Sequence, residues 1–253
     1  MHASGLRWDD VSMPHGQATV LRARVGQTPI AFLKCHRAAA SFTLEFYALR
    51  TWGPSLQPDV PTLLAVEPQD KVLLLSPLPG RTEVFDTPPD LQDLPRRQAI
   101  ARASGAFLAR LHALPLPDSD ERPLREVLPL RAKSWGAQAQ GLIDDRTIAK
   151  AVERVSEMAD GDWGRVPCHR DYSPRNWLIG PGDPFRFSVI DFGHSKADTW
   201  LYDVIRLVDG SHGFGEPEMQ AFWEGYGRHP NKAELGLLDG LLWLHALGTL
   251  VWA

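Results

Sequence analysis

One stretch in the second half of the chain, Cys168–Asn176 (CHRDYSPRN), constrains the fold more than any other feature. Fifteen residues after Asn176, beyond a Gly- and Pro-rich turn, an apolar run leads into the tripeptide DFG that begins at Asp191. This order predicts two short strands joined by a hairpin, which returns Asp191 to the side of Asn176. An amide oxygen and a carboxylate on neighbouring strand ends can hold Mg²⁺ against phosphate groups. We therefore expect Asn176 and Asp191 to be magnesium ligands, with Asp171 on the same loop placed to reach a hydroxyl group.

The combined spacing is far more specific than its parts. HRD or DFG alone is a weak signal, and an accidental match is the alternative interpretation. HRDxxxxN, followed at hairpin distance by two apolar residues and DFG, matches the kinase catalytic-loop pattern in order and in spacing. The chain contains no GxxxxGK[ST], HExxH or GxSxG. These absences argue against a P-loop enzyme and against the commonest zinc-protease and hydrolase classes.

A lysine upstream of this loop lies in an apolar, strand-like run. Only six of the 27 basic side chains are lysines, and Lys34 is the one in the sequence IAFLKC. In a kinase, such a lysine holds nucleotide phosphates; the alternative is an exposed lysine on an edge strand. Glu45 is the first acidic residue after it, on a predicted helix, and we expect the two to pair. The phosphate-covering loop is poorly marked, because the first turn contains a single glycine, Gly16, whose backbone amide is the candidate group to cover the phosphates.

Apolar periodicity predicts strands in the first third of the chain and mostly helices afterwards. The expected strands are Leu6–Val11, Ala18–Arg24, Pro29–His36, Thr62–Val66, Lys71–Ser76, Val166–His169, Trp177–Ile179 and Phe185–Ile190. The expected helices are Ala38–Trp52, Arg97–Leu114, Leu130–Ala139, Asp145–Met158, Trp200–Val208, Glu216–Tyr226 and Ala233–Ala253. Pro and Gly residues at 76–80 predict the boundary between the two parts.

Composition excludes several classes of protein. The 253 residues are 43% hydrophobic and 23% charged, as in globular domains, and the net charge of −4 does not suggest a nucleic-acid partner. Two distant cysteines and the lack of a signal peptide favour a cytoplasmic protein with free thiols. The apolar stretch Leu235–Ala253 is marginal for a membrane span because Asp239 and His245 interrupt it, and we expect a buried helix. We expect no membrane partner, and the oligomeric state stays open.

Four features together resemble one family over about residues 5–253. They are the Lys34 strand with the Glu45 helix, LLLSPLPG at 73–80, LARLH at 108–112, and the 169–176 loop with IDFG at 190–193. The chain is similar to the aminoglycoside phosphotransferases, small-molecule kinases with a protein-kinase-like fold that also include choline-kinase-type enzymes. The resemblance implies an α+β, bilobal fold. Its expected parts are a β-rich nucleotide-binding lobe (1–76), a hinge (77–81), and a mainly helical lobe with the catalytic loop and acceptor site (82–253).

The resemblance also implies roles for individual residues, with ATP or GTP and Mg²⁺ as cofactors. Asp171 would be the catalytic base, and the backbone around Ser76 and Leu78 would bind the purine edge. His169 and Asp203 would support the catalytic loop. Only eleven residues separate the DFG aspartate from Asp203, which leaves no room for a long activation segment. A small-molecule acceptor is therefore favoured over a protein.

The charge distribution bears on the acceptor. After Trp177 the chain has ten acidic and five basic residues. This excess would suit a cationic acceptor such as an aminoglycoside or a related antibiotic, and antibiotic resistance would follow; an ordinary solvated surface is the alternative. The candidate acceptor contacts are Asp198, Glu216, Glu218, Glu224 and the loop at 118–126. A metabolite kinase of the choline, homoserine or sugar type, and a non-catalytic kinase-like binding protein, remain as other hypotheses.

Overall fold

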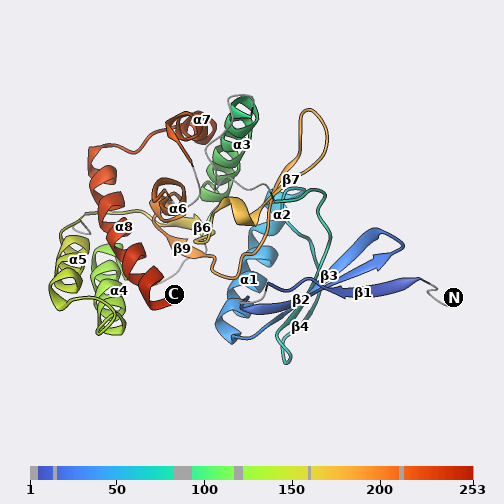
Figure 1. The fold of residues 1–253 in the computed structure, drawn as a ribbon, viewed down its shortest axis with the longest axis horizontal. Coiled ribbons are helices and arrows are strands. Elements are labelled where there is room, and N and C mark those ends of the chain that lie inside the picture. The colour runs from blue at the N-terminus through green and yellow to red at the C-terminus, as the bar shows by residue number, and fades with distance from the viewer. Residues whose placement is uncertain are drawn as a thin grey trace. The chain divides into compact units, whose positions relative to one another are not determined.

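The computed structural model describes residues 5–13, 16–82, 93–116, 122–158, 161–210 and 214–252 (Figure 1). The chain forms two units. Unit 1 contains Met1–Val84 and Ser173–Lys196, and unit 2 contains Phe85–Tyr172 and Ala197–Ala253. The α+β class expected from the sequence is confirmed, with the strands concentrated near the N-terminus.

Unit 1 is built on a five-stranded antiparallel sheet with strand order β1-β2-β3-β5-β4. The strands are β1 (Leu6–Asp10), β2 (Ala18–Val25), β3 (Thr28–His36), β4 (Leu63–Glu67) and β5 (Val72–Leu75). Helix α1 (Ala39–Thr51) packs against β3, β4 and β5, and the short α2 (Gly53–Leu56) follows it. Phe42, Ala48 and Leu49 are buried on α1, so this helix and the sheet share one core.

A hairpin from the second half of the chain completes unit 1. It consists of the 3₁₀ turn η1 (Pro174–Asn176), β7 (Trp177–Ile179) and β8 (Phe187–Val189). Ile179 N–H donates to the Arg81 carbonyl at 2.9 Å, and Val189 N–H donates to the Asp59 carbonyl at 2.8 Å. Sequence reasoning places this segment in the helical part. The structure groups it with the N-terminal strands, because these backbone bonds attach it there.

The predicted hinge segment contains a position that requires glycine. Gly80 has a φ of +122°, and a Cβ there would lie 2.7 Å from the carbonyl carbon of Ile179. Any side chain would therefore face both backbone strain and a clash with β7. The unit boundary at Val84 lies three residues beyond the expected hinge, 77–81.

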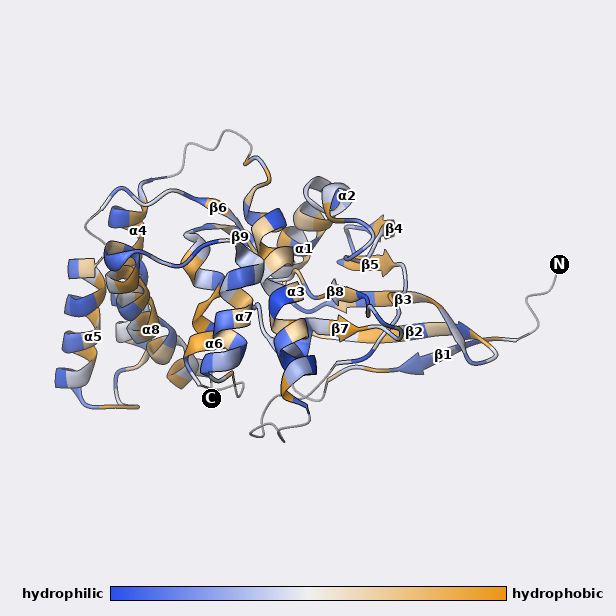
Figure 2. Cartoon of the chain, turned by 90° about the horizontal axis from the view of Figure 1, so that it is seen from above, coloured by the Kyte–Doolittle hydropathy of each residue, from blue (hydrophilic) through white to orange (hydrophobic). Residues whose placement is uncertain are grey.

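Unit 2 is mainly helical, with two short strands. Its helices are α3 (Leu94–His112), α4 (Leu124–Gln138), α5 (Asp145–Met158), α6 (Ile205–Val208), α7 (Glu216–Tyr226) and α8 (Lys232–Trp252), with the 3₁₀ turn η2 (Trp200–Asp203). Strand β6 (Val166–Cys168) pairs with β9 (Lys196–Asp198). Hydrophilic and hydrophobic residues both occur along α5 (Figure 2). Its buried residues Ile148, Ala151 and Val155 recur at helical spacing.

The C-terminal helix packs one face into unit 2. Lys232–Val251 is long and apolar enough to cross a membrane by length and composition alone, and 33% of that stretch is buried. Leu247 belongs to a core cluster with Ala139, Ile148 and Ala151. The expected buried helix is therefore buried along one side.

Helix α4 differs from its prediction. The expected helix starts after Pro129, because proline often marks a helix boundary. The helix instead begins at Leu124 and contains Pro129. Leu124, Leu128 and Ala132 are all buried on this helix. Tertiary packing on both sides of the proline outweighs the lost backbone hydrogen bond.

Candidate active site

The charged centre of unit 1 consists of Lys34, Glu45 and Asp191. The Lys34 Nζ atom lies 2.7 Å from Glu45 Oε2 and 2.8 Å from Asp191 Oδ1. Lys34 is 9% exposed and Glu45 1% exposed. Burial lowers the pKa of Lys34, but the charges of Glu45 and then Asp191 outweigh it and raise that pKa above its usual value. The expected pairing of Lys34 with Glu45 is confirmed.

The position of Lys34 follows from the sheet. Strand β3 lies between β2 and β5, and Lys34 is opposite Val20 on one side and Leu73 on the other. A lysine on a central strand is not an edge-strand lysine, so the alternative interpretation is excluded. His36, two residues further on the same face of β3, lies 3.0 Å from Glu45 through its Nε2 atom. Glu45 therefore has two partners, of which the sequence analysis found one.

Asn176 directly precedes β7 and Asp191 follows β8, so both lie at the open end of the β7–β8 hairpin. The register pairs Trp177 with Val189, and Ile190 N–H donates to the Asn176 carbonyl at 3.0 Å. Asp191 has a φ of 66°, a sparsely populated conformation for a residue other than glycine. An amide oxygen and a carboxylate are ligand types that Mg²⁺ prefers, so these residues fit the predicted role.

Asp203 hydrogen-bonds the backbone of the predicted catalytic loop in unit 2. Its Oδ2 accepts the His169 N–H at 2.8 Å and its Oδ1 accepts the Arg170 N–H at 2.5 Å. Arg170 has a φ of 64°, again sparsely populated. Two charge-assisted hydrogen bonds to consecutive amides hold the loop in this conformation. The predicted support role of Asp203 agrees with these bonds.

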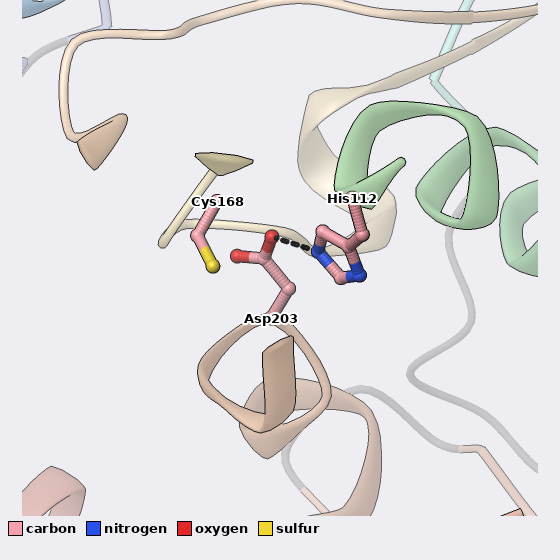
Figure 3. Close-up of side chains that lie close together, drawn as sticks. All are labelled: His112, Cys168 and Asp203. Carbon is pink, nitrogen blue, oxygen red and sulfur yellow. Dashed lines mark hydrogen bonds and ion pairs between the residues drawn. The ribbon is translucent and has the colours of Figure 1, made fainter. Parts of the chain in front are cut away.

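His112 and Cys168 lie beside Asp203 in a cluster of three buried side chains (Figure 3). His112 Nε2 is 3.0 Å from Asp203 Oδ2, and its Nδ1 is 2.9 Å from the Tyr226 hydroxyl. Burial raises the pKa of the Cys168 thiol well above its usual value, which keeps it protonated. The thiol donates to the carbonyl of Thr199 at 3.3 Å. These groups therefore form a hydrogen-bond network next to the predicted catalytic loop.

The predicted base, Asp171, has an ion-pair partner that the sequence analysis missed. Arg206 Nη2 on α6 lies 3.0 Å from Asp171 Oδ1. The side chains are 38% and 24% exposed, respectively. One carboxylate oxygen of Asp171 is thus held by a guanidinium group at a position open to solvent.

The predicted acceptor contacts divide into buried and exposed acids. Asp198 is fully buried, and its Oδ2 lies 2.9 Å from Arg131 and 3.3 Å from Arg170. Glu218 is 1% exposed and pairs with Arg97 at 2.8 Å. Neither carboxylate is accessible to an acceptor, because both are buried. Each is paired with an arginine, as a buried charge requires.

Glu216 and Glu224 are exposed on α7, and Glu224 pairs with Arg102 at 2.5 Å. Both acids reach solvent, Glu224 as part of an ion pair, and their role as acceptor contacts stays a prediction. Of the candidate loop 118–126, residues 118–121 lie outside the described part of the chain.

The predicted purine-binding segment is half-buried in unit 1. Ser76 N–H donates to the Thr62 carbonyl at 2.9 Å, and Ser76 Oγ accepts the Thr62 N–H at 2.8 Å. The Ser76 N–H and hydroxyl are thus bonded to Thr62, and the expected contacts of the Ser76–Leu78 backbone with a purine stay predictions. Gly16 N–H donates to the Met13 carbonyl at 2.9 Å, which closes a tight turn. Pro14 and His15 within that turn lie outside the described residues.

Comparison with known proteins adds a family and several relatives. The sequence profile of the phosphotransferase enzyme family matches residues 19–238. An N-acetylmuramate/N-acetylglucosamine kinase of Pseudomonas aeruginosa is 29% identical over 187 residues, which cover 70% of this chain and 53% of that protein. An aminoglycoside 3'-phosphotransferase of Streptomyces fradiae is 29% identical over 154 residues, covering 53% of this chain and 54% of that protein. The chain thus spans about half the length of the curated relatives it matches.

Solved structures agree on the fold. A GDP and kanamycin complex of APH(2")-IIia superposes with a TM-score of 0.73 at 14% identity, covering 96% of this chain and 84% of the other. A choline/ethanolamine kinase family protein of Mesorhizobium loti gives a TM-score of 0.70 at 18% identity, covering 97% of this chain and 77% of the other. At such identities the likeness concerns the fold alone.

Proposed function

Because the chain belongs to the phosphotransferase enzyme family, we propose that it transfers the terminal phosphoryl group of ATP or GTP to a hydroxyl of a small molecule. The observation that carries this proposal is the Lys34–Glu45–Asp191 centre, in which Lys34 and Glu45 are buried, Asp191 is part-exposed, and both ion-pair distances are below 3 Å. A buried lysine held between a buried and a part-exposed carboxylate is a charge cluster of the kind that occurs at functional sites. In this site the lysine would bind the phosphate groups of a nucleotide.

In this proposal Lys34 binds phosphate oxygens while Glu45 holds its ammonium group in place. Asn176 and Asp191 would hold Mg²⁺, which when bound neutralises phosphate charge. Asp191 Oδ1 already accepts from Lys34 at 2.8 Å. Its carboxylate therefore orients the lysine as well as presenting a ligand oxygen. The segment from Ser76 to Leu78 would bind the purine edge.

Asp171 would orient the acceptor hydroxyl and accept its proton late in the transfer. The bond between the acceptor oxygen and the terminal phosphorus forms as the bond from that phosphorus to the bridging oxygen breaks, leaving a nucleoside diphosphate. The transition state is loose, so positioning contributes most of the rate. Asp203 performs that positioning by fixing the amides of His169 and Arg170.

For the acceptor we propose an amino sugar, that is, a single sugar ring with an amino or acetamido substituent. This chemistry is common to the names of both curated relatives. The second candidate is an aminoglycoside antibiotic, which the exposed acids Glu216 and Glu224 favour. Burial and pairing of Asp198 and Glu218 remove much of the acidic surface that suggested a polycation.

The test uses the purified full chain with Mg²⁺ and either ATP or GTP. The acceptors are glucosamine, N-acetylglucosamine, N-acetylmuramate, kanamycin, choline and homoserine. Release of nucleoside diphosphate and the mass of the product identify the acceptor. We expect Asp171→Ala to lose at least about 100-fold in kcat, while Asp162→Ala, at an exposed position, keeps wild-type activity. Identical behaviour of wild type and Asp171→Ala with every acceptor would contradict the proposal and favour a binding protein.

A cellular arm separates the two acceptor classes. A host that expresses the chain is tested for aminoglycoside susceptibility, and its medium for a phosphorylated drug. Resistance accompanied by phosphorylated drug would favour the aminoglycoside. Unchanged susceptibility with sugar phosphorylation in vitro would favour the amino sugar.

A further inference from the structure

The ion pair between Arg206 and Asp171 places a guanidinium group beside the carboxylate that is proposed to receive the acceptor hydroxyl. Arg206 Nη2 is 3.0 Å from Asp171 Oδ1. If Asp171 receives the acceptor hydroxyl, the guanidinium group must lie within a few ångströms of the substituents next to that hydroxyl. Both side chains are part-exposed, so an acceptor can approach them directly.

The fold holds Arg206 in this position. Helix α6 is a single turn, Ile205–Val208, and its residues Ile205 and Leu207 are each 1% exposed. Burial of the residues on both sides fixes the backbone between them, and Arg206 is directed away from that core. The next residue beyond α6, Asp209, pairs with His245 of α8 at 3.2 Å. The turn is thus attached to unit 2 on both sides of the arginine.

The other acids around the predicted catalytic loop in unit 2 have cationic or N–H partners of their own, so they do not add a free negative charge beside the Arg206–Asp171 pair. Asp198 is matched by Arg131 and Arg170. Asp203 accepts from two amides and from His112. Asp171 itself is matched by Arg206. Among the described residues of the loop and η2, each carboxylate therefore already has a cationic or N–H partner.

We propose that Arg206 determines the charge of the acceptor: it favours a hydroxyl whose neighbouring substituents are neutral or anionic, and disfavours one beside an ammonium group. This inference rests on the proposed function, because it takes Asp171 as the group that receives the acceptor. The physical basis is Coulombic. A substituent that lies nearer to the Arg206 guanidinium than to the Asp171 carboxylate meets a positive potential, so an ammonium group there is repelled and a carboxylate is attracted.

The test uses three sugars with the same ring and different charge: the free amine, the N-acetyl amide, and the N-acetyl form that bears a carboxylate. They are compared at a pH where the amine is protonated. We expect wild type to prefer the amide and the carboxylate over the amine by at least about tenfold in kcat/KM. Arg206→Gln should reduce that ratio at least about fivefold, mainly through the acceptor KM, and Arg206→Lys should largely restore it.

Two controls isolate the effect of charge. Arg146→Gln removes an exposed arginine of α5, and we expect it to keep the wild-type ratio. Thermal melting of each variant confirms that it folds. Calorimetric dissociation constants for the three sugars, in the presence of a non-hydrolysable nucleotide, provide a readout that does not need turnover.

The outcomes separate this inference from the proposed function. If no sugar is phosphorylated, the proposed acceptor is wrong, while the dissociation constants still measure charge selection. If the sugars are phosphorylated but Arg206→Gln lowers all three rates equally, Arg206 acts on the transferred phosphate and the inference is overturned. A wild-type preference for the amine would overturn it as well.

Discussion

At the scale of single residues, the ammonium group of Lys34 depends on two carboxylates. Burial lowers its pKa, and Glu45 and then Asp191 raise it by more. Replacing Glu45 with Gln leaves a buried lysine and a buried His36 without their shared partner. We expect Glu45→Gln to destabilise the protein by about 3 kcal/mol, measured by urea unfolding. Glu153→Gln, at an exposed position of α5, should change the free energy of unfolding by less than about 0.5 kcal/mol.

The pH dependence of this loss follows from the sign of the shift. A lysine whose pKa is raised on folding stabilises the native state fully below its unfolded pKa, near 10.5. That stabilisation is lost only as the pH rises through the higher folded value. The part of the Glu45→Gln loss in free energy of unfolding that comes from Lys34 should therefore be constant from about pH 7 to 9. A deficit that disappears within this window would show that the lysine is not the group responsible.

Sequence reasoning at this scale succeeds where the partners are marked by a local pattern. Lys34 and Glu45 can be paired in advance because a buried lysine needs an acid and the following helix supplies one. Arg206 and His112 carry no such mark, because arginines and histidines on helices are usually solvent-facing. Their roles depend on Asp171 and Asp203, which only the tertiary fold brings to them.

At the scale of elements, α3 and α7 approach so closely that glycine is required on both. A Cβ on Gly105 would lie 2.1 Å from the Phe222 carbonyl oxygen, and one on Gly225 would lie 1.9 Å from that of Arg102. The same helix pair brings Tyr226 to His112. We expect Gly105→Ala to cost at least about 2 kcal/mol in the free energy of unfolding, because a backbone carbonyl cannot move aside as a flexible side chain can.

The matched control for that measurement is Gly164→Ala. Gly164 is exposed, and a Cβ there would meet nothing within 4 Å. It should change the free energy of unfolding by less than about 0.5 kcal/mol in urea titrations. Equal effects of the two alanines would mean that α3 and α7 can separate without cost, contrary to their packing.

Element types were predictable where the hydrophobic period was clear, as for β3, α1 and α5. Element boundaries were less predictable, because tertiary packing decides them. Pro129 lies inside α4 although proline usually ends a helix, and η1 forms within a loop whose sequence shows no helical period. The local sequence signals neither the helix through Pro129 nor the turn η1, because the contacts that stabilise them come from other parts of the chain.

At the scale of the whole molecule, the net charge of a segment was a poor guide to its surface. The excess of acids after Trp177 suggested a cationic acceptor, yet Asp198 and Glu218 are buried against arginines that precede them in the chain. Charge counted along the sequence includes groups that folding removes from the surface. The potential that an acceptor meets depends on the residues left exposed, among which Arg206 has the opposite sign.

The proposed nucleotide site also has a consequence for the stability of the whole chain. A ligand that binds only the native state stabilises it by about 2.7 kcal/mol at 100 times its Kd. For a chain of this length that corresponds to a rise in Tm of about 5 °C or more. We expect Mg²⁺ with ATP or GTP to produce this rise in thermal melting, and the nucleotide with a chelator to produce less, because Asn176 and Asp191 would hold the metal between protein and phosphates.

Two variants of one hairpin decide whether that rise comes from the predicted site. Asp191→Asn removes the carboxylate at the end of β8 and should abolish the Mg²⁺-dependent part of the shift. Asp183→Asn changes an exposed acid in the turn of the same hairpin and should keep the shift of wild type. Because Asp191→Asn also weakens the Lys34 centre, its Tm without ligand is expected to fall, and the ligand-induced difference is the quantity compared. An unchanged Mg²⁺-dependent difference in Asp191→Asn would place the metal and the nucleotide elsewhere on the protein.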